Sequence, residues 1–211
     1  MKRLQLKVCG MREADNIAQV AALAPDYIGF VFVAGSPRDA TAVVKRESLA
    51  SIPDGVTTVG VFRDAALEFV CEKVKELGLK AVQLHGSEDE RYIERLRGAI
   101  GGVTVVRAVA VRSGADLSEV KDLPGLVDLF LLDSGSGGSG VPFDWSCLSE
   151  YRASTPFLLA GGIRSENRER AVAAAQSVSG CVGLDLNSGL ESSPGVKDIN
   201  LVRSFCEGIR V

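Results

Sequence analysis

The 211-residue sequence has very little histidine and no closely paired cysteines. His85 is the only histidine, and the five cysteines form no Cys-x-x-Cys pair. Their odd number and wide spacing fit neither a disulfide framework nor a zinc site, so we expect reduced thiols. The cysteine pattern therefore argues against a disulfide-linked secreted domain and against a structural zinc domain.

The chain also lacks long apolar runs and an excess of basic residues. The N-terminal MKRLQLKVCG has no apolar segment of signal-peptide length, and no run approaches the roughly 18 apolar residues of a membrane span. The net charge of −3 provides no basic surface for nucleic acid or anionic lipid. We therefore expect a cytoplasmic protein that binds a small molecule, with neither nucleic acid nor membrane as a partner. Nothing in the sequence indicates an oligomeric state.

What the sequence does contain is a regular alternation of short apolar runs and amphipathic stretches. With 46% hydrophobic residues the chain can bury one sizeable core, and 211 residues is a normal length for an α/β barrel. Each apolar run is followed by charged, helix-forming sequence, with a period of about 26 residues. The predicted strands are 4–9, 27–32, 57–62, 81–85, 103–109, 129–133, 157–161 and 181–186. Eight such repeats predict a single (β/α)8 barrel domain over residues 1–211 rather than an open doubly wound sheet.

Reactive side chains stand at the carboxyl ends of several predicted strands, where barrel active sites lie. Cys9 ends the first strand, Arg38 follows the second, His85 closes the fourth and Asp133 ends the sixth. A cysteine is often only a small buried hydrophobe, and an aspartate often only caps a turn. Because an acid, a base and a charge meet at one rim, we favour chemical roles for Cys9 and Asp133. For His85, packing or hydrogen bonding is at least as strong an interpretation as proton transfer.

Glycine-bearing turns follow the last two predicted strands. Gly161 and Gly162 come after the seventh strand, and Ser188 and Gly189 come after the eighth. Barrel enzymes often bind phosphate through backbone N–H groups at these two positions. The turns predict a phosphorylated substrate, whereas the glycines of either turn alone could serve only to permit a tight bend.

The segment GSGGSG at 135–140 matches two other patterns, both of which we reject. It fits the GxGxxG pattern of dinucleotide folds, but the next helix is expected to be capped only at Asp144, too late to place its N-terminus on a pyrophosphate. It also has the composition of an interdomain linker, but the strand and helix alternation continues through it. We interpret it as a mobile sixth loop over the mouth of the barrel.

Together these motifs resemble one enzyme family along essentially the whole chain. The segments that carry the resemblance are KVCGMR, GFVF with SPR after it, VQLHG, LLDSGSGGSG with FDW after it, AGGI and DLNSGLESSPGVKD. Their order and spacing are similar to those of phosphoribosylanthranilate isomerase, a family of tryptophan biosynthesis. The resemblance implies conversion of N-(5-phosphoribosyl)anthranilate to 1-(2-carboxyphenylamino)-1-deoxyribulose 5-phosphate by an Amadori rearrangement, with neither a cofactor nor a metal.

The resemblance also implies roles for three matching residues. Asp133 matches the family's general acid, which protonates the furanose ring oxygen and opens the sugar to a Schiff base. Cys9 matches the general base, which removes the C2 proton to give an enolamine. Arg38 matches the arginine that holds the anthranilate carboxylate, a task suited to its planar fork of donors.

These roles place opposite requirements on two pKa values. Asp133 must be protonated, which favours an apolar wall that raises its pKa, and Cys9 must reach the thiolate from a reference of about 8.5. Burial alone opposes thiolate formation, so nearby cations or backbone dipoles are needed. Lys7 lies on the same face of the first strand as Cys9 and is one candidate.

Two other functions remain open at this point. One is a related sugar-phosphate isomerase or epimerase of histidine or pentose metabolism, against which Cys9 argues because it replaces a carboxylate or metal-binding residue. The other is a phosphate-binding barrel without catalysis, for which Cys9, Asp133 and Arg38 together would be a coincidence. The sequence departs from the commoner family pattern at Met11 and at Asn187, and Asn187 leaves the number of phosphate contacts open.

Overall fold

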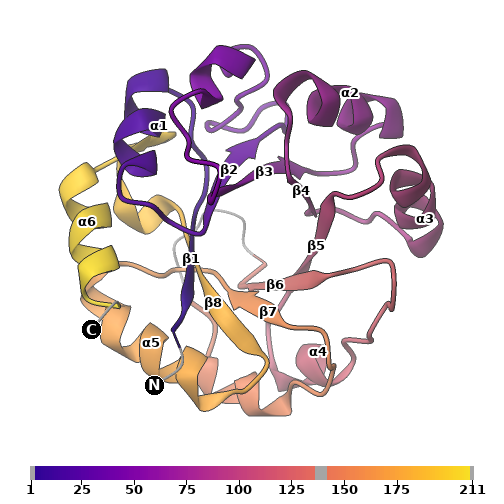
Figure 1. Cartoon of the computed structure of the whole chain (residues 1–211). Helices are drawn as coiled ribbons and strands as arrows, with labels where there is room; N and C mark the ends of the chain where they lie inside the picture. The colour runs from indigo at the N-terminus through magenta and orange to yellow at the C-terminus, as the bar shows by residue number, and fades with distance from the viewer. Residues whose placement is uncertain (1–2, 136–141, 210–211) are drawn as a thin grey trace.

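A closed barrel of eight parallel strands forms the centre of the protein, as the computed structural model shows (Figure 1). The structure describes residues 3–135 and 142–209. Each strand pairs with the next along the chain, and the eighth closes the ring by pairing with the first. The strands are β1 (Gln5–Val8), β2 (Tyr27–Val31), β3 (Thr57–Phe62), β4 (Ala81–Leu84), β5 (Thr104–Ala110), β6 (Leu129–Asp133), β7 (Phe157–Leu159) and β8 (Cys181–Leu186). The predicted (β/α)8 barrel is confirmed, with strand ends that differ from the predicted ones by up to two residues.

The helices outside the barrel are less complete than the repeat pattern predicts. Within the described residues the α-helices are α1 (Ala14–Ala21), α2 (Leu67–Leu77), α3 (Glu90–Ala99), α4 (Gly114–Ser118), α5 (Arg168–Ser177) and α6 (Ile199–Glu207). Among the residues that the structure describes, β2 and β6 are followed by short 3-10 turns in place of an α-helix, namely η1 (Arg46–Leu49) and η2 (Trp145–Glu150). The expectation of a full helix after every strand is wrong at these two places, because both segments are rich in Ser, Thr and Pro, which favour turns. None of the described helices is both long and apolar enough to cross a membrane.

Aspartate side chains fix where several helices begin. Asp89 accepts a hydrogen bond from the Tyr92 N–H at the start of α3, and Asp198 accepts bonds from the first N–H groups of α6. Asp144 accepts from the Ser146 N–H, so the predicted cap is confirmed, although the helix that it caps is the 3-10 turn η2. These caps set the ends of the loops that form the mouth of the barrel.

The hydrophobic core has an outer and an inner part. In the outer part, buried strand residues such as Ile28 form one cluster with buried helix residues such as Val202. The inner part fills one side of the barrel interior with alternate residues of β5, β6 and β7. We call this cluster the apolar side, and it consists of Val106, Leu129, Leu131, Leu158 and Ala160.

A small antiparallel hairpin, which the sequence analysis did not predict, follows β8. It consists of β9 (Glu191–Ser193) and β10 (Val196–Lys197), and strands of three and two residues are too short to show an alternating pattern. Gly195 turns between them with a φ of +88°. The hairpin brings two charged side chains, Glu191 and Lys197, to the mouth of the barrel.

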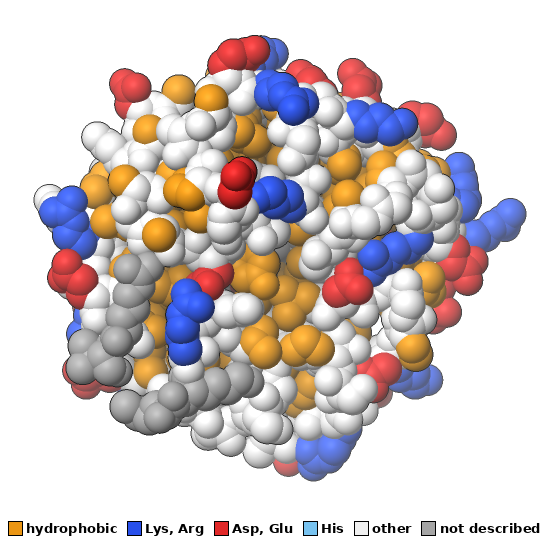
Figure 2. Space-filling view, in the orientation of Figure 1, with side chains coloured by type: hydrophobic (Ala, Val, Ile, Leu, Met, Phe, Trp, Pro, Cys, Tyr) orange, Lys and Arg blue, Asp and Glu red, His pale blue; other side chains and the backbone are white. Residues whose placement is uncertain are grey.

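One face of the molecule carries charges of both signs with hydrophobic side chains between them (Figure 2). Lys and Arg side chains alternate there with Asp and Glu side chains, and no broad basic area is seen on this face. The view agrees with the small net charge of the sequence, −3.

Candidate active site

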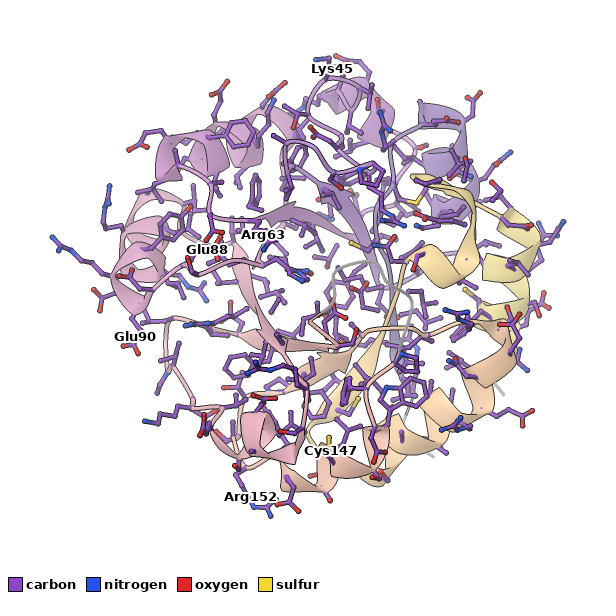
Figure 3. The ribbon with its side chains drawn as sticks, turned by 180° about the vertical axis from the view of Figure 1, so that it is seen from behind. Lys45, Arg63, Glu88, Glu90, Cys147 and Arg152 are labelled. Atoms are coloured by element: carbon purple, nitrogen blue, oxygen red, sulfur yellow. The ribbon has the colours of Figure 1, made fainter. Side chains whose placement is uncertain are left out.

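A cavity of about 660 Å³ lies among the loops that follow the barrel strands. Figure 3 shows the molecule from behind. Arg63 follows β3 and lines the cavity, and it is labelled near the centre of this view. Cys147 on η2 is labelled farther from the centre. The lining includes nearly all of the residues that the sequence predicted for the site, namely Cys9, Arg38, His85, Asp133, Gly161, Gly162 and Ser188. The barrel closure therefore brings these separate strand ends to one place.

Cys9 lies directly after β1, with only 4% of its surface exposed. Its N–H donates to the Leu186 carbonyl at 2.8 Å, which ties the end of β1 to β8. A Cβ at Gly29 would lie 2.7 Å from the Cys9 sulfur, so the absence of a side chain on β2 makes room for the thiol. Cys9 is thus buried against the strands but lines the cavity.

A buried ion pair lies below Cys9, and we call Lys7, Cys9 and Asp185 the charged side of the barrel. Parallel pairing of β1 with β8 sets Lys7 opposite Asp185, and Lys7 Nζ donates to Asp185 Oδ2 at 3.0 Å. Burial raises the pKa of the Cys9 thiol, and the charges of Lys7 and Lys197 oppose this without overcoming it. The predicted cation is present, and Lys197 is a second one, but the net pKa shift is upward.

Asp133 lies at the end of β6 with its side chain 17% exposed. Its Oδ1 accepts the Ser134 N–H at 2.7 Å, and its Oδ2 lies 3.6 Å from His85 Nε2. Burial raises the pKa of Asp133, but the His85 imidazole and the Ser134 N–H together bring it below its usual value. The expected apolar wall and raised pKa are therefore wrong for this structure, because β4 places a polar ring beside the carboxylate.

His85 is oriented by a neighbour on its own strand. The Gln83 amide nitrogen lies 3.0 Å from His85 Nδ1. With that nitrogen assigned as the donor, Nδ1 is the acceptor, and the ring proton is on Nε2, which faces Asp133. The arrangement supports the hydrogen-bonding interpretation of His85 and places it against the candidate acid.

Arg38 lines the cavity, and a carboxylate holds its guanidinium. Nη2 and Nε donate to the two oxygens of Glu191, with the shortest contact at 2.7 Å. The hydrogen bonds to Glu191 raise the pKa of Arg38. Arg38 lies at the mouth, as the sequence predicted, but its partner Glu191 was not predicted.

The two glycine turns lie against each other. Gly161 and Gly162 have φ of +86° and +65°, and a Cβ at Gly161 would lie 2.7 Å from Asp133 Oδ1. A Cβ at Gly189 would lie 2.2 Å from the Ile163 carbonyl oxygen, so the turn after β8 packs directly on the turn after β7. Ser188 lines the cavity. The neighbouring Gly189 contacts the turn after β7.

Three charged residues of the site were missed by the sequence analysis. Asp185 interrupts the apolar strand CVGLDL as Asp133 ends LFLLD, so the signal that identified Asp133 was present for Asp185 as well. Its Oδ1 is buried and has no hydrogen-bond partner among the described residues. Glu191 and Lys197 had no comparable signal, because only the hairpin brings them to the mouth.

Two further predictions concern loops and metals. The predicted loop at Gly135–Gly140 lies, after Gly135, outside the described residues. All five cysteines are free. Over residues 3–135 and 142–209, no group of three His, Cys, Asp or Glu side chains is arranged to hold a metal ion.

A thiol, a carboxylate, an imidazole and an arginine around one cavity at the strand ends of a (β/α)8 barrel define the site of a barrel enzyme. The family model described as N-(5'-phosphoribosyl)anthranilate (PRA) isomerase matches residues 6–208. The chain therefore belongs to the N-(5'-phosphoribosyl)anthranilate isomerase family, and it is an enzyme of the isomerase class.

Individual relatives agree with the family match. The N-(5'-phosphoribosyl)anthranilate isomerase of Parabacteroides distasonis is 40% identical over 208 residues, covering 97% of this chain and 92% of the relative. The crystal structure of phosphoribosyl anthranilate isomerase from Thermus thermophilus is 28% identical with a TM-score of 0.85, and the match covers 98% of each chain. A second crystal structure, 25% identical with a TM-score of 0.76 over 98% of each chain, is of an isomerase in complex with reduced 1-(o-carboxyphenylamino)-1-deoxyribulose 5-phosphate.

Proposed function

We propose that the protein converts N-(5'-phosphoribosyl)anthranilate to 1-(2-carboxyphenylamino)-1-deoxyribulose 5-phosphate in tryptophan biosynthesis, with Asp133 as general acid and Cys9 as general base. The observation that carries the proposal is that both groups line one cavity beside Arg38. The complex of the solved relative with a reduced form of this product supports the same substrate class.

The rearrangement needs one proton donor and one proton acceptor. Asp133 gives its proton to the ring oxygen while the bond from C1 to that oxygen breaks, and the nitrogen lone pair forms the C1=N bond of the Schiff base. The Cys9 thiolate then takes the C2 proton, and the electrons of that C–H bond form C1=C2 of the enolamine. The enolamine gains a proton at C1 and loses the C2 hydroxyl proton to become the ketone. Hydrogen moves only within the substrate and the two side chains, so we propose no cofactor and no metal.

The pKa shifts in the structure favour the opposite protonation states before substrate binds. The pKa of Cys9 is raised and the pKa of Asp133 is lowered, so a thiol and a carboxylate predominate. The reactive form, a Cys9 thiolate with a neutral Asp133, contains the same number of protons as the predominant thiol–carboxylate form. The fraction of protein in the reactive form is therefore independent of pH between the pKa values of Asp133 and Cys9. Substrate that displaces water from Asp133 raises the pKa of this carboxyl, while Lys7 and Lys197 stabilise the thiolate.

The remaining contacts orient the substrate across the mouth. Arg38 binds the anthranilate carboxylate, and the turns at 161–162 and 188–189 bind the 5-phosphate through backbone N–H groups. The contact between Gly189 and Ile163 supports this assignment, because it brings the two turns to one position. We propose this phosphorylated aminosugar as the partner of a single domain, residues 1–211, that acts in the cytoplasm.

Loss of substrate fluorescence after addition of purified protein tests the function directly. We expect a decay whose rate rises in proportion to the protein concentration. The histidine-pathway aminoaldose is assayed in parallel, and turnover of that compound alone would favour the alternative sugar-phosphate isomerase. Binding of both compounds without turnover would support a barrel that binds phosphate and does not catalyse.

A further inference from the structure

The mouth of the barrel contains a buried cluster of three charges, Arg38, Glu191 and Lys197, and we call it the arginine clamp. Glu191 accepts Arg38 Nη2 at 2.7 Å and Lys197 Nζ at 2.7 Å. The exposed fractions of the Arg38, Glu191 and Lys197 side chains are 14%, 5% and 0%. The pairs that Glu191 forms with Arg38 and Lys197 are buried and therefore have a fixed geometry, unlike exposed pairs of charged side chains.

Glu191 binds one edge of the guanidinium and leaves the other edge available. Its oxygens receive the Nε and Nη2 groups of Arg38. A guanidinium has a second edge, formed by Nη1 and Nη2, that can bind another carboxylate through two parallel hydrogen bonds. Among the described residues Nη1 donates to no protein group, and Arg38 lines the cavity.

Within the clamp, Glu191 lies between two basic side chains, Arg38 and Lys197. Burial lowers the pKa of Lys197, and the charge and hydrogen bond of Glu191 oppose this shift. Burial opposes ionisation of Glu191, but its bonds from Arg38 and the charge of Lys197 hold its pKa below the usual value. An anthranilate group carries one carboxylate, and Arg38 is the cation of the clamp that lines the cavity.

The backbone around the clamp fixes the stems of its side chains. A Cβ at Gly10, whose φ is +82°, would lie 2.7 Å from Asn187 Oδ1 and 2.8 Å from Arg38 Cδ, so only glycine lets these side chains pass. Lys197 Nζ donates to Asn187 Oδ1 at 2.9 Å. The Asn16 side chain accepts the Lys197 N–H and donates to the Lys197 carbonyl, which ties the hairpin to α1. The clamp is thus held from β1, β8 and α1.

We propose that Glu191 is a positioning residue for substrate recognition, which holds Arg38 side-on so that the free guanidinium edge meets the aromatic carboxylate of the substrate. The inference rests on the proposed role of Arg38. An arginine held in one rotamer loses less conformational entropy when the carboxylate binds, and its free edge is aligned before binding. Glu191 acts through Arg38 and touches no reacting atom.

Two product analogues, with and without the aromatic carboxylate, provide the test. The measured quantity is the dissociation constant of the analogue without the carboxylate divided by that of the analogue with it. This ratio is measured for the unaltered protein and for Glu191→Gln, which keeps the shape of the side chain but removes its charge. We expect Glu191→Gln to reduce this ratio about tenfold, by weakening binding of the carboxylated analogue alone. KM for the substrate should rise with a much smaller change in kcat.

Three further variants separate positioning from structural damage. Glu191→Asp keeps the charge and should restore part of the ratio, and it replaces Glu191→Gln if the latter does not fold. In an Arg38→Ala background, Glu191→Gln should have no further effect on the ratio. Glu47→Gln removes an acid from an exposed position on η1, outside the cavity, and should leave the ratio unchanged.

The outcomes distinguish this inference from the proposed function. Equal affinity of the unaltered protein for both analogues would refute the role of Arg38 itself. A protein that discriminates between the analogues would overturn the role of Glu191 alone if Glu191→Gln has the same ratio as the unaltered protein, or, where Glu191→Gln does not fold, if Glu191→Asp does. Equal weakening of both analogues would also overturn it, because that result indicates general distortion of the site.

Discussion

The charged side and the apolar side of the barrel interior bury different kinds of side chain. On the charged side, β1 and β8 bury the Lys7–Asp185 ion pair directly below Cys9. On the apolar side, β5, β6 and β7 bury aliphatic side chains, and Asp133 ends β6. One closed sheet therefore combines a hydrophobic support with a buried ion pair.

The two sides have different physical roles. Aliphatic packing stabilises the fold and excludes water, which strengthens every electrostatic interaction in the neighbouring cavity. Burying ions is unfavourable unless they are paired, and Lys7 and Asp185 are paired in register. We therefore expect substitutions of Cys9 and Asp133 to change chemistry, and substitutions on the apolar side to change stability alone. Removal of one member of the Lys7–Asp185 pair should also cost stability, because it leaves a buried charge without its partner.

The largest expected effect is on turnover. Cys9→Ala and Asp133→Asn should each lower kcat by about 10² to 10⁴, because each removes a positioned acid or base. Both variants should unfold near the urea concentration of the parent protein, since neither removes a large packed group. Folded variants with near-normal turnover would remove these two assignments.

Breaking the buried ion pair should be costly to the fold. Lys7→Met leaves Asp185 buried without its partner and should lower the free energy of unfolding by about 3 to 5 kcal/mol. The double variant Lys7→Met with Asp185→Asn removes both charges and should recover much of this loss. Urea denaturation of the two variants measures the difference, and equal stability of both would contradict the ion-pair argument.

A truncation on the apolar side should affect stability without affecting chemistry. Leu158 is fully buried, and Leu158→Ala should lower the free energy of unfolding by about 2 to 5 kcal/mol through lost contacts and a cavity. Leu158→Met, of similar volume, is the matched control and should cost less than about 1.5 kcal/mol. The kcat of the folded Leu158→Ala protein at 25 °C should stay near that of the parent, and a fall comparable to that of Cys9→Ala would erase the contrast between the two sides.

The smallest expected effect is on the pH dependence of stability. The folded pKa of Asp133 is below its unfolded value of about 3.9, so its contribution is present above that pH and is lost as the pH falls. The folded pKa of Cys9 is above its unfolded value of about 8.5, so stability decreases as the pH rises past that value. Asp133→Asn should flatten the acid side of the stability curve, and Cys9→Ala the alkaline side. Parallel curves for parent and variants would show that these groups do not contribute.

Much of the site could be predicted from the sequence because strand ends are readable from local pattern. The apolar run LFLLD ends in a carboxylate, and KVCG ends in a thiol and a glycine, so Asp133 and Cys9 stood out before any fold was known. Once eight strands form one barrel, their carboxyl ends share one mouth. The predicted helices after β2 and β6 were wrong. The alternation of strands and helices elsewhere in the chain does not determine whether a segment rich in Pro and Ser forms a full α-helix.

Periodicity and residue order are local properties of the chain, and they were enough to predict the eight-stranded barrel and the side chains at its mouth. The partners and pKa values of these side chains depend instead on the folded arrangement. Arg38 and Glu191 are 153 residues apart in sequence, and Asp133 meets His85 only because β4 and β6 belong to one closed sheet. Electrostatic and hydrogen-bond energies depend on separations of a few ångströms, and no local pattern contains those separations.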